Sequence, residues 1–370
     1  MSAVPLESPA GGGDVWQQAN DWFLRHDLTD GLPIVPPTED RVRAMTDHVE
    51  RVLGWSRHDT VTTLAPKWGA ATIEAIAANA VMAGCAPEYM PVLVAATQAL
   101  GLPKFNLDAV QTSTHNTSAI AVVNGPVRKA IDLNCGYNVT GSRWRSTSTI
   151  GRALRLIMAN IGGTPGSVNI HTQGHIARYE HCIGENEEQS PWAPLHVERG
   201  FAPESSAVTL IPACPASMID DNGGSQTGKE LLRTFAHSLP AVGNRNYNGE
   251  GQPALILCPQ HAQTFANGGY SKAEVKEFLW ARARLRFGDI PTGNLVSFSK
   301  RNLKLFADVN PDYGFPIAEK PDDIVIVVMG GTGTHSLSVQ TQLACRTVTV
   351  PIARKDGTPV RWDADGRLAG

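Results

Sequence analysis

The sequence predicts a mixed α/β protein, and three observations lead to this fold class. Segments with helical periodicity dominate residues 14–100. From about residue 203 to 352, short apolar runs alternate with helical segments, the pattern of a parallel three-layer α/β domain. The chain has 370 residues, enough for two to three domains of about 150 residues each. We expect an N-terminal helical and mixed α/β domain over 14–202, a C-terminal parallel three-layer α/β domain over 203–352, and a tail over 353–370.

The N-terminal half predicts a helical hairpin followed by a buried strand. Pro36 and Pro37 exclude helix, and Thr38 is a good N-cap for the helix that follows. Gly84 ends an alanine-rich helix, and Pro87 opens the next one. The expected elements are, in order, helices over 14–25, 39–52, 69–83 and 87–100, a strand over 118–126 and a helix over 146–160.

The C-terminal half predicts strands that alternate with helices. The strands are expected over 207–211, 254–258 and 324–329, and the helices over 229–237, 259–266 and 272–284. Residues 169–201, by contrast, are polar and have few periodic apolar positions. A stretch of this length without regular structure is uncommon in a compact domain unless it has a function. We therefore expect an active-site loop there.

Composition and charge exclude several classes of protein. The chain is 42% hydrophobic and 18% charged, with a formal net charge of −3, which argues against a nucleic-acid-binding protein. Its longest apolar run covers 324–329, far short of the roughly 20 residues of a membrane-spanning helix. The first ten residues lack a signal-peptide pattern, and the six cysteines lack CxxC spacing, so we expect a cytoplasmic protein with reduced thiols. The low surface charge predicts a homo-oligomer or a complex with another enzyme subunit.

Cys85 is the first candidate catalytic residue. It lies between two predicted helices, directly before the helix that Pro87 opens. A helix N-terminus stabilises a thiolate through its N–H groups and dipole, and Gly84 leaves room for a substrate. We therefore expect Cys85 to be the most reactive cysteine, with Cys135 as its main competitor. The alternative is a cysteine that only packs in the hairpin.

Two other cysteines are expected to be inert. Cys214 and Cys258 each end a predicted strand and precede a proline. We expect both to be shielded by the buried strands that carry them.

Residues 169–201 hold the candidate proton carriers and metal ligands. His171 and His175 are four residues apart, as are His181 and Glu185, and on a helix each pair would share a face and could bind a divalent metal ion. Gly174 and Gly184 interrupt any such helix. The alternative is a polar loop in which these side chains, with Glu198, cap helices and pair with arginines.

A third group of candidates surrounds the predicted strand at 118–126. His115 follows a run of hydroxyl residues, and Asn124 lies at the strand end, so the pair could form a cradle for an oxyanion or a carboxylate. Arg143 and Arg145 precede a helix start, where they would favour an anionic ligand. The alternatives are a hydrogen-bonded core histidine and solvent-facing arginines.

The fourth candidate is the glycine-rich segment GGTGTHS at 330–336, which follows a hydrophobic strand. Its spacing matches neither the dinucleotide fingerprint nor the P-loop, so the sequence does not predict a nucleotide site. We expect a substrate-binding edge here that includes Gly331 and Gly333, with His335 or Ser336 reaching the ligand.

Several long phrases resemble one bacterial protein family. They are DGLPIVPPTEDRV (30–42), WGAATIEAIAANAVMAGCAPEYMP (68–91), GRALRLIMANIGG (151–163), ENEEQSPWAPLHVERGF (185–201) and GGYSKAEVKEFL (268–279). This family is associated with the UGSC-type proteins, relatives of the selenoprotein B component of glycine reductase. The resemblance implies a selenolate or thiolate that attacks a substrate carbon and displaces an amine or another leaving group, with Cys85 in the nucleophile's place.

The sequence departs from the pattern of that family at two points. TGSRWRS (140–146) stands where a Gly-Pro-Gly-Asn phrase is expected, and His115 is followed by Asn116 instead of proline. Both departures imply an altered substrate preference.

Together these observations predict an enzyme of lyase or transferase type that uses thiol chemistry. It would cleave or form a carbon–heteroatom bond in a small, polar, anionic molecule. Cys85 would be the nucleophile, His175 or His181 the proton carrier, Glu185 or Glu198 the orienting carboxylate, and Arg143 or Arg145 the anion clamp. One alternative is a metal-dependent lyase or hydrolase that uses His171, His175, His181 and Glu185. The other is a non-catalytic subunit of a larger enzyme complex.

Overall fold

The structure is a computed structural model that describes residues 14–141, 143–163, 171–174, 181–248, 251–294 and 314–369. Its N-terminal half is mainly helical, with one small hairpin and two strands of the central sheet. The helices are α1 (Val15–Arg25), α2 (Glu39–Leu53), α3 (Ile73–Ala83), the 3-10 helix η1 (Pro87–Tyr89), α4 (Met90–Leu100), α5 (Leu107–Thr112), α6 (Val127–Ala130) and α7 (Arg145–Asn160). The strands are β1 (Thr60–Leu64), β2 (Gly69–Thr72), β3 (Ser118–Asn124) and β4 (His181–Gly184).

The C-terminal half alternates strands and helices around one long strand. The strands are β5 (Ala207–Asp220), β6 (Ala254–Leu257), β7 (Arg284–Arg286), β8 (Gly314–Pro316), β9 (Val325–Val328), β10 (His335–Thr341) and β11 (Val348–Pro351). The helices are α8 (Leu195–Glu198), α9 (Gly228–Ser238), α10 (Pro259–Asn267) and α11 (Lys272–Arg282), with 3-10 turns η2 (Glu187–Gln189), η3 (Arg245–Asn248), η4 (Phe287–Asp289) and η5 (Pro321–Asp323).

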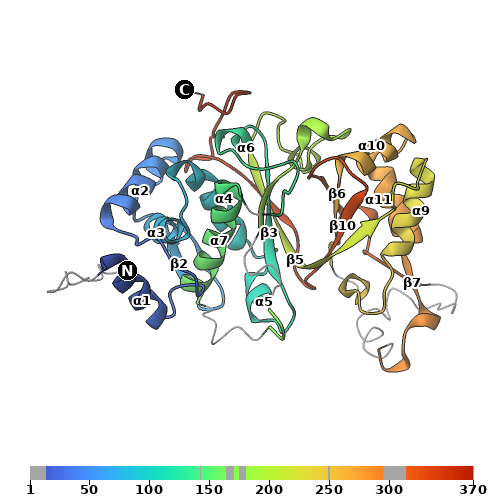
Figure 1. Cartoon of the computed structure of the whole chain (residues 1–370), viewed down its shortest axis with the longest axis horizontal. Coiled ribbons are helices and arrows are strands. Elements are labelled where there is room, and N and C mark those ends of the chain that lie inside the picture. The colour runs from blue at the N-terminus through green and yellow to red at the C-terminus, as the bar shows by residue number, and fades with distance from the viewer. Residues whose placement is uncertain are drawn as a thin grey trace.

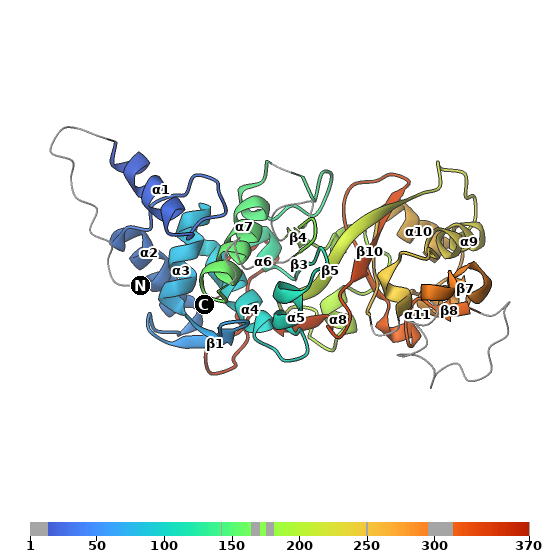
Figure 2. The ribbon, with the colours of Figure 1, turned by 90° about the horizontal axis from the view of Figure 1, so that it is seen from below.

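Among the described residues, seven strands form one mixed sheet in the order β4-β3-β5-β10-β6-β9, with β11 also paired to β5. The first half of β5 pairs with β3, and its second half pairs with β10. Thus β5 belongs to two walls of the sheet and runs through the middle of the molecule (Figures 1 and 2). Two pairs are parallel, β3 with β4 and β6 with β9, while β10 is antiparallel to both its neighbours.

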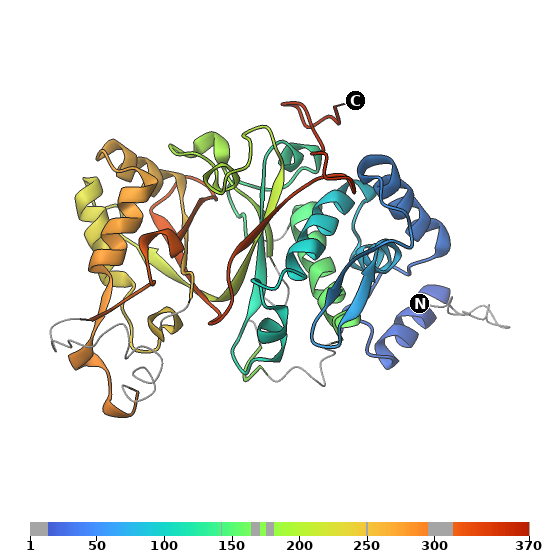
Figure 3. The ribbon, with the colours of Figure 1, turned by 180° about the vertical axis from the view of Figure 1, so that it is seen from behind.

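The two walls of the curled sheet face each other across an apolar core. Ile120 and Val122 of β3 and Val325 and Val327 of β9 belong to the same buried cluster. The residues that alternate with them on these strands point to the opposite faces, as the two-residue period of a strand requires. Helices α4, α6 and α7 contact one wall, with α1 to α3 packed farther out, and α9 to α11 cover the other wall, so the two groups of helices lie on opposite sides of the sheet (Figure 3).

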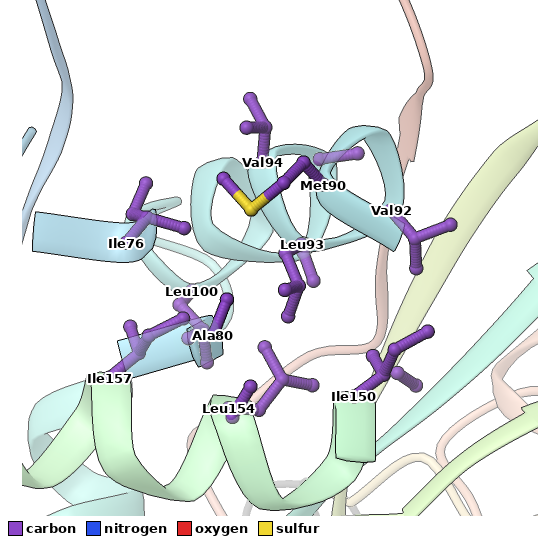
Figure 4. Packing of buried hydrophobic residues seen from close by; sticks show 14 of the residues in the cluster. Ile76, Ala80, Met90, Val92, Leu93, Val94, Leu100, Ile150, Leu154 and Ile157 are labelled. Atoms are coloured by element: carbon purple, nitrogen blue, oxygen red, sulfur yellow. The ribbon is translucent and has the colours of Figure 1, made fainter. Parts of the chain in front are cut away.

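The largest core lies between the first wall and the N-terminal helices. Helix α4 packs against α3 and α7, and Leu93, Leu154 and Ile157 are fully buried where these helices meet (Figure 4). This hairpin of apolar helices explains why residues 69–100 are rich in alanine: they face other protein elements on almost every side.

The structure confirms the mixed α/β class, and it differs from the expected elements in the start of the alanine-rich helix and in the direction of the C-terminal strands. The alanine-rich helix starts at Ile73, because Gly69–Thr72 pairs with Thr60–Leu64 as a hairpin. The C-terminal strands form a mixed sheet instead of a parallel one, because β10 returns antiparallel between β5 and β6.

Within the described residues, no helix is long and apolar enough to cross a membrane.

Candidate functional site

Several strand ends converge at one edge of the curled sheet. The chain leaves β4 at Gly184. The next N–H group, of Glu185, donates to Val123 O of β3 at 3.1 Å, and the N–H of Asn186 donates to Val328 O of β9 at 2.8 Å. Met329, which follows β9, bonds to Leu257 at the end of β6. The carboxyl ends of β3, β4, β6 and β9 therefore lie close together. Such edges are where open α/β proteins bind their ligands.

Cys258 lies at this edge, between β6 and α10. Its backbone is extended (ψ 153°), and Pro259 occupies the first position of α10. A proline there is compatible with the helix because the first N–H has no helical partner. The thiol is consequently held at the start of a nine-residue helix, where free N–H groups and the helix dipole favour a negative charge.

A buried relay of side chains joins Cys258 to a carboxylate. Ser336 Oγ accepts a hydrogen bond from Cys258 N at 3.1 Å, lies 2.8 Å from His261 Nδ1 and can donate to Cys258 Sγ at 3.6 Å. On the other side of the imidazole, His261 Nε2 lies 3.2 Å from Asp221 Oδ1. Cys258, His261 and Ser336 are 5%, 2% and 1% exposed. The order nucleophile, base, carboxylate is that of a catalytic triad, with a serine hydroxyl inserted between the first two.

The hydrogen-bond acceptors in this relay determine which atoms carry protons. Burial would raise the pKa of the Asp221 carboxyl, but the N–H groups of Gly223 and Ser225 and the His261 ring hold it below its ordinary value. Asp221 is therefore a carboxylate, and His261 Nε2 must donate to it. If Nδ1 is also protonated, both acceptor sites of Ser336 Oγ are occupied, by Cys258 N–H and by His261. Its hydroxyl proton is then directed to Cys258 Sγ.

The thiolate of Cys258 and the imidazolium of His261 stabilise each other. Burial disfavours both ions, but hydrogen bonding and charge between them outweigh it: the pKa of Cys258 is lowered and that of His261 is raised. Asp221 adds to the increase at His261, and Ser336 to the decrease at Cys258. In its neutral form, the thiol donates to Gly333 O at 2.9 Å.

Two loops cover the relay. One is residues 221–225, which Asp221 closes by accepting hydrogen bonds from Gly223 N at 2.9 Å and Ser225 N at 3.2 Å. The other is residues 330–335. A side chain added at Gly333 would meet no atom within 4 Å, so open space adjoins the carbonyl that holds the thiol.

A second charged cluster lies at the same edge of the sheet. The buried guanidinium of Arg128 contacts Glu187 at 2.9 Å and Glu188 at 3.1 Å, and donates to Glu185 O at 2.6 Å. Gly330 N, in the loop that covers the relay, bonds to Cys135 O at 2.9 Å. Arg128 also donates to Cys135 Sγ at 3.5 Å, so Cys135 links this cluster to one end of that loop.

Of the six cysteines, all of which the structure describes, Cys258 is the one whose pKa is lowered. Burial raises the pKa of Cys85 to about 12, and Thr149 and Arg145 offset only part of this effect. This burial acts against the Cys85 thiolate that a helix start would favour. Burial also raises the pKa of Cys135 and Cys182, of Cys214 to about 11 and of Cys345 to about 12.

The predicted metal ligands do not meet in the described part of the chain. His181 lies at the start of β4, and Glu185 lies just beyond its end. Four residues along a strand separate the two side chains by about 13 Å, whereas on a helix they would share a face. His171 Nε2 lies 3.2 Å from Val110 O, and burial lowers its pKa. His175 lies outside the described residues. Within those residues, no group of three or more His, Cys, Asp or Glu side chains could hold a metal ion.

The two predicted carboxylates have structural partners. Glu185 is fully buried and accepts from Asn124 Nδ2 at 2.6 Å and Leu195 N at 2.7 Å, and burial raises its pKa. Glu198 pairs with Lys272 at 3.0 Å and with Lys276. Burial would raise the pKa of Glu198, but the two lysines hold it below its ordinary value.

The remaining predicted residues lie in separate places. Arg145 Nε donates to Gly84 O at 3.0 Å, beside Cys85, and Arg143 is exposed. Gly331 contacts the ring of Tyr137, and His335 is exposed and lies 3.5 Å from Asp220. His115 lines a cavity at a different part of the sheet.

Apart from Ser336, sequence reasoning missed the residues of the relay, although one further signal was present. Cys258 and His261 are three residues apart at the start of a helix that Pro259 opens, so both side chains can face the same way. Ser336 is brought to them by the pairing of β10 with β6, and Asp221 by the pairing of β5 with β10. No protein-family model matches the chain, and no curated protein matches it either.

Proposed function

We propose that the protein is a cysteine-dependent enzyme that cleaves or forms a carbon–heteroatom bond in a small, polar, anionic molecule, with Cys258 as its nucleophile. The observation that carries this proposal is the buried relay Cys258–Ser336–His261–Asp221 at the carboxyl ends of the strands. Burial usually raises the pKa of a thiol, and here the relay reverses that effect. A thiolate in a buried site is a strong nucleophile because little water surrounds it.

The reaction would proceed by a covalent intermediate. The thiolate electron pair of Cys258 forms a bond to the substrate carbon, and the carbon–heteroatom bond breaks with its electron pair on the leaving group. The proton that the leaving group needs comes from the His261 imidazolium through the Ser336 hydroxyl. Water then attacks the same carbon, its proton returns to His261, and the carbon–sulfur bond breaks to restore the thiolate.

Each other member of the site has a defined task in this scheme. The Asp221 carboxylate fixes the imidazole orientation and stabilises its positive charge, and the start of α10 stabilises negative charge on the substrate. The loops at 221–225 and 330–335 restrict the site to small molecules and exclude bulk water. A substrate would enter beside Gly333, where the structure leaves open space. The proposal also includes a cytoplasmic location and assembly of the protein into an oligomer.

The experiment is a comparison of wild type with Cys258→Ser and Cys85→Ser in a metabolite extract. Serine keeps the size of the side chain, but its hydroxyl is not ionised at neutral pH, so it separates a nucleophilic role from a packing role. Small polar compounds consumed by wild type and by Cys85→Ser, but not by Cys258→Ser, would support the proposal, as would a mass addition on the Cys258 peptide after acid quenching. Equal consumption by wild type and Cys258→Ser would refute it.

A further inference from the structure

Glu185 is a buried acid at a joint between two strands and a helix. It directly follows β4, and its neighbour Asn124 is the last residue of β3; both side chains are fully buried. Glu185 Oε2 accepts a hydrogen bond from Asn124 Nδ2 at 2.6 Å and another from Leu195 N, at the start of α8, at 2.7 Å. The acid therefore holds the end of a central strand against the start of a helix.

The amide nitrogen of Asn124 serves two carboxyl groups at once. It also donates to Glu187 Oε1 at 2.9 Å, so the carboxyl groups of Glu185 and Glu187 are close neighbours. When two carboxyl groups share a site, ionisation of one opposes ionisation of the other. Glu187 has the Arg128 guanidinium at 2.9 Å, whereas no cation within the described residues is bonded to the side chain of Glu185. This difference assigns the negative charge to Glu187 and the proton to Glu185.

Two oxygen atoms without partners indicate where this proton lies. Glu185 Oε1 and Asn124 Oδ1 are both buried, and neither has a hydrogen-bond partner in the part of the chain that the structure describes. Both atoms are acceptors when Glu185 is ionised, so neither can bond to the other, and a buried polar atom without a partner is costly. A proton on Oε1 makes Glu185 a donor toward the amide that it already contacts through Oε2. One proton would therefore give both oxygens a partner.

The surroundings of Glu185 favour its uncharged form. Burial raises its pKa, and the Glu187 carboxylate adds to this increase. Lys272 opposes the increase, but its ammonium group already donates to Ala193 O at 2.8 Å and contacts Glu198 at 3.0 Å. Burial lowers the pKa of His196, so its imidazole supplies no compensating charge. The charged and titratable groups around the joint are Arg128 of α6, Glu187 and Glu188 of η2, His196 of α8 and Lys272 of α11.

We propose that Glu185 and Asn124 form a proton-dependent lock that joins β3 and β4 to the start of α8. At neutral pH, Glu185 keeps a proton on Oε1 and donates it to Asn124 Oδ1, while Oε2 accepts from Asn124 Nδ2 and Leu195 N. When this proton is lost as pH rises, two bare oxygens face each other and a second negative charge lies beside Glu187. The joint is then weakened.

The lock lies next to the loop that covers Cys258. Asn186 follows Glu185 directly, and its side-chain amide donates to Gly330 O at 3.1 Å, at the start of that loop. The backbone N–H of Asn186 donates to Val328 O at the end of β9. The lock therefore supports the segment that anchors the loop, but it does not depend on any thiol chemistry at Cys258.

The test is urea unfolding of wild type and Glu185→Gln between pH 5 and 9. Glutamine has the shape of the protonated acid and cannot ionise. In the unfolded chain, Glu185 ionises with the ordinary pKa of about 4.3, and in the folded protein its pKa is raised. Wild type therefore loses stability as pH rises through this interval, and the variant does not. We expect the unfolding equilibrium constant of wild type, divided by that of the variant, to rise by up to about tenfold per pH unit and then to level off.

Glu188→Gln is the matched control, since Glu188 belongs to the same segment but pairs with Arg128. Its pKa is lowered, so its contribution changes only in acid, and the same ratio for this variant should stay constant above about pH 5. A ratio for Glu185→Gln that is equally constant would overturn the proposal.

Infrared spectra of wild type keep the test decisive if Glu185→Gln fails to fold. Of the aspartates and glutamates that the structure describes, Glu185 is the one whose pKa is raised. The folded protein at neutral pH should therefore show the C=O stretch of a protonated carboxyl group, and this band should disappear when urea unfolds the protein at the same pH. Absence of the band from the folded protein would also overturn the proposal.

Discussion

Removal of the Ser336 hydroxyl should affect both the stability of the protein and the reactivity of Cys258. In Ser336→Ala, the N–H of Cys258 loses its acceptor and His261 Nδ1 loses its partner, both in a site closed to solvent. A buried polar group without a partner costs about 1 to 3 kcal/mol, so we expect the free energy of unfolding to fall by about 2 kcal/mol.

The same substitution removes the hydroxyl donor to the thiolate of Cys258. A hydrogen bond to a charged group contributes about 1.5 kcal/mol or more, and one pKa unit corresponds to about 1.4 kcal/mol. We therefore expect the pKa of Cys258 to rise by about one unit and its alkylation at neutral pH to slow by about tenfold.

Ser338→Ala is the matched control for both effects. Ser338 is a buried serine of the same strand, and its hydroxyl makes no side-chain hydrogen bond within the part of the chain that the structure describes. The two variants should be compared by urea unfolding and by iodoacetamide labelling with peptide mass mapping. Equal stability and equal labelling of Cys258 in both variants would refute the relay.

Three further predictions test the charges and the close packing. Asp221→Asn should destabilise the protein most at about pH 5 to 6.5, as measured by urea unfolding. The pair stabilises the fold only while Asp221 is ionised and His261 is protonated. Because the pKa of Asp221 is lowered, this stabilisation disappears as pH falls, and because the pKa of His261 is raised, it disappears as pH rises above neutral. A loss that does not depend on pH would contradict this. Arg128→Met should destabilise by about 2 kcal/mol at neutral pH, because the buried guanidinium loses its ion pairs with Glu187 and Glu188 and Glu185 O loses its donor. The loss should be smaller in acid, because Arg128 holds the pKa of the Glu188 carboxyl below its ordinary value and this contribution disappears as pH falls; a loss that does not depend on pH would count against it. Gly69→Ala should lower the melting temperature more than Gly136→Ala does. The added methyl group would lie 2.0 Å from Ile161 O at Gly69, a clash, but 3.9 Å from Asn134 Oδ1 at Gly136, an ordinary contact. Equal melting temperatures would contradict the packing at Gly69.

Most of the helices could be predicted because their local signals agree with the fold. Asp14 and Thr72 accept hydrogen bonds as N-caps, and Gly84 ends α3 in the left-handed conformation that glycine adopts without strain. Strand β10 was missed because its sequence HSLSVQT contains only two apolar residues, Leu337 and Val339, and follows a glycine-rich turn. Strand β4 has only four residues and follows a long polar stretch, so its pairing with β3 is decided by tertiary contacts.

The sequence indicated a cysteine at a helix start, but it did not indicate which cysteine has an imidazole beside it. Both Cys85 and Cys258 have a helix start nearby. What separates them is their surroundings: Cys85 lies among apolar side chains of α3, α4 and α7, whereas Cys258 has His261 and Ser336 beside it. Only the sheet order brings Ser336 and Asp221 to the start of α10, and that order is not encoded in any local pattern.

The most direct test of the central claim is the rate of iodoacetamide labelling of each of the six cysteines as a function of pH. If the relay activates the thiol, Cys258 is labelled first at neutral pH, and the midpoint of its rate profile lies below the ordinary thiol value of about 8.5. In His261→Gln, this midpoint rises toward or above the ordinary value, while His237→Gln, at an exposed position on α9, leaves it unchanged. Labelling of Cys85 or Cys135 before Cys258, or a Cys258 midpoint that does not respond to His261→Gln, would contradict the account.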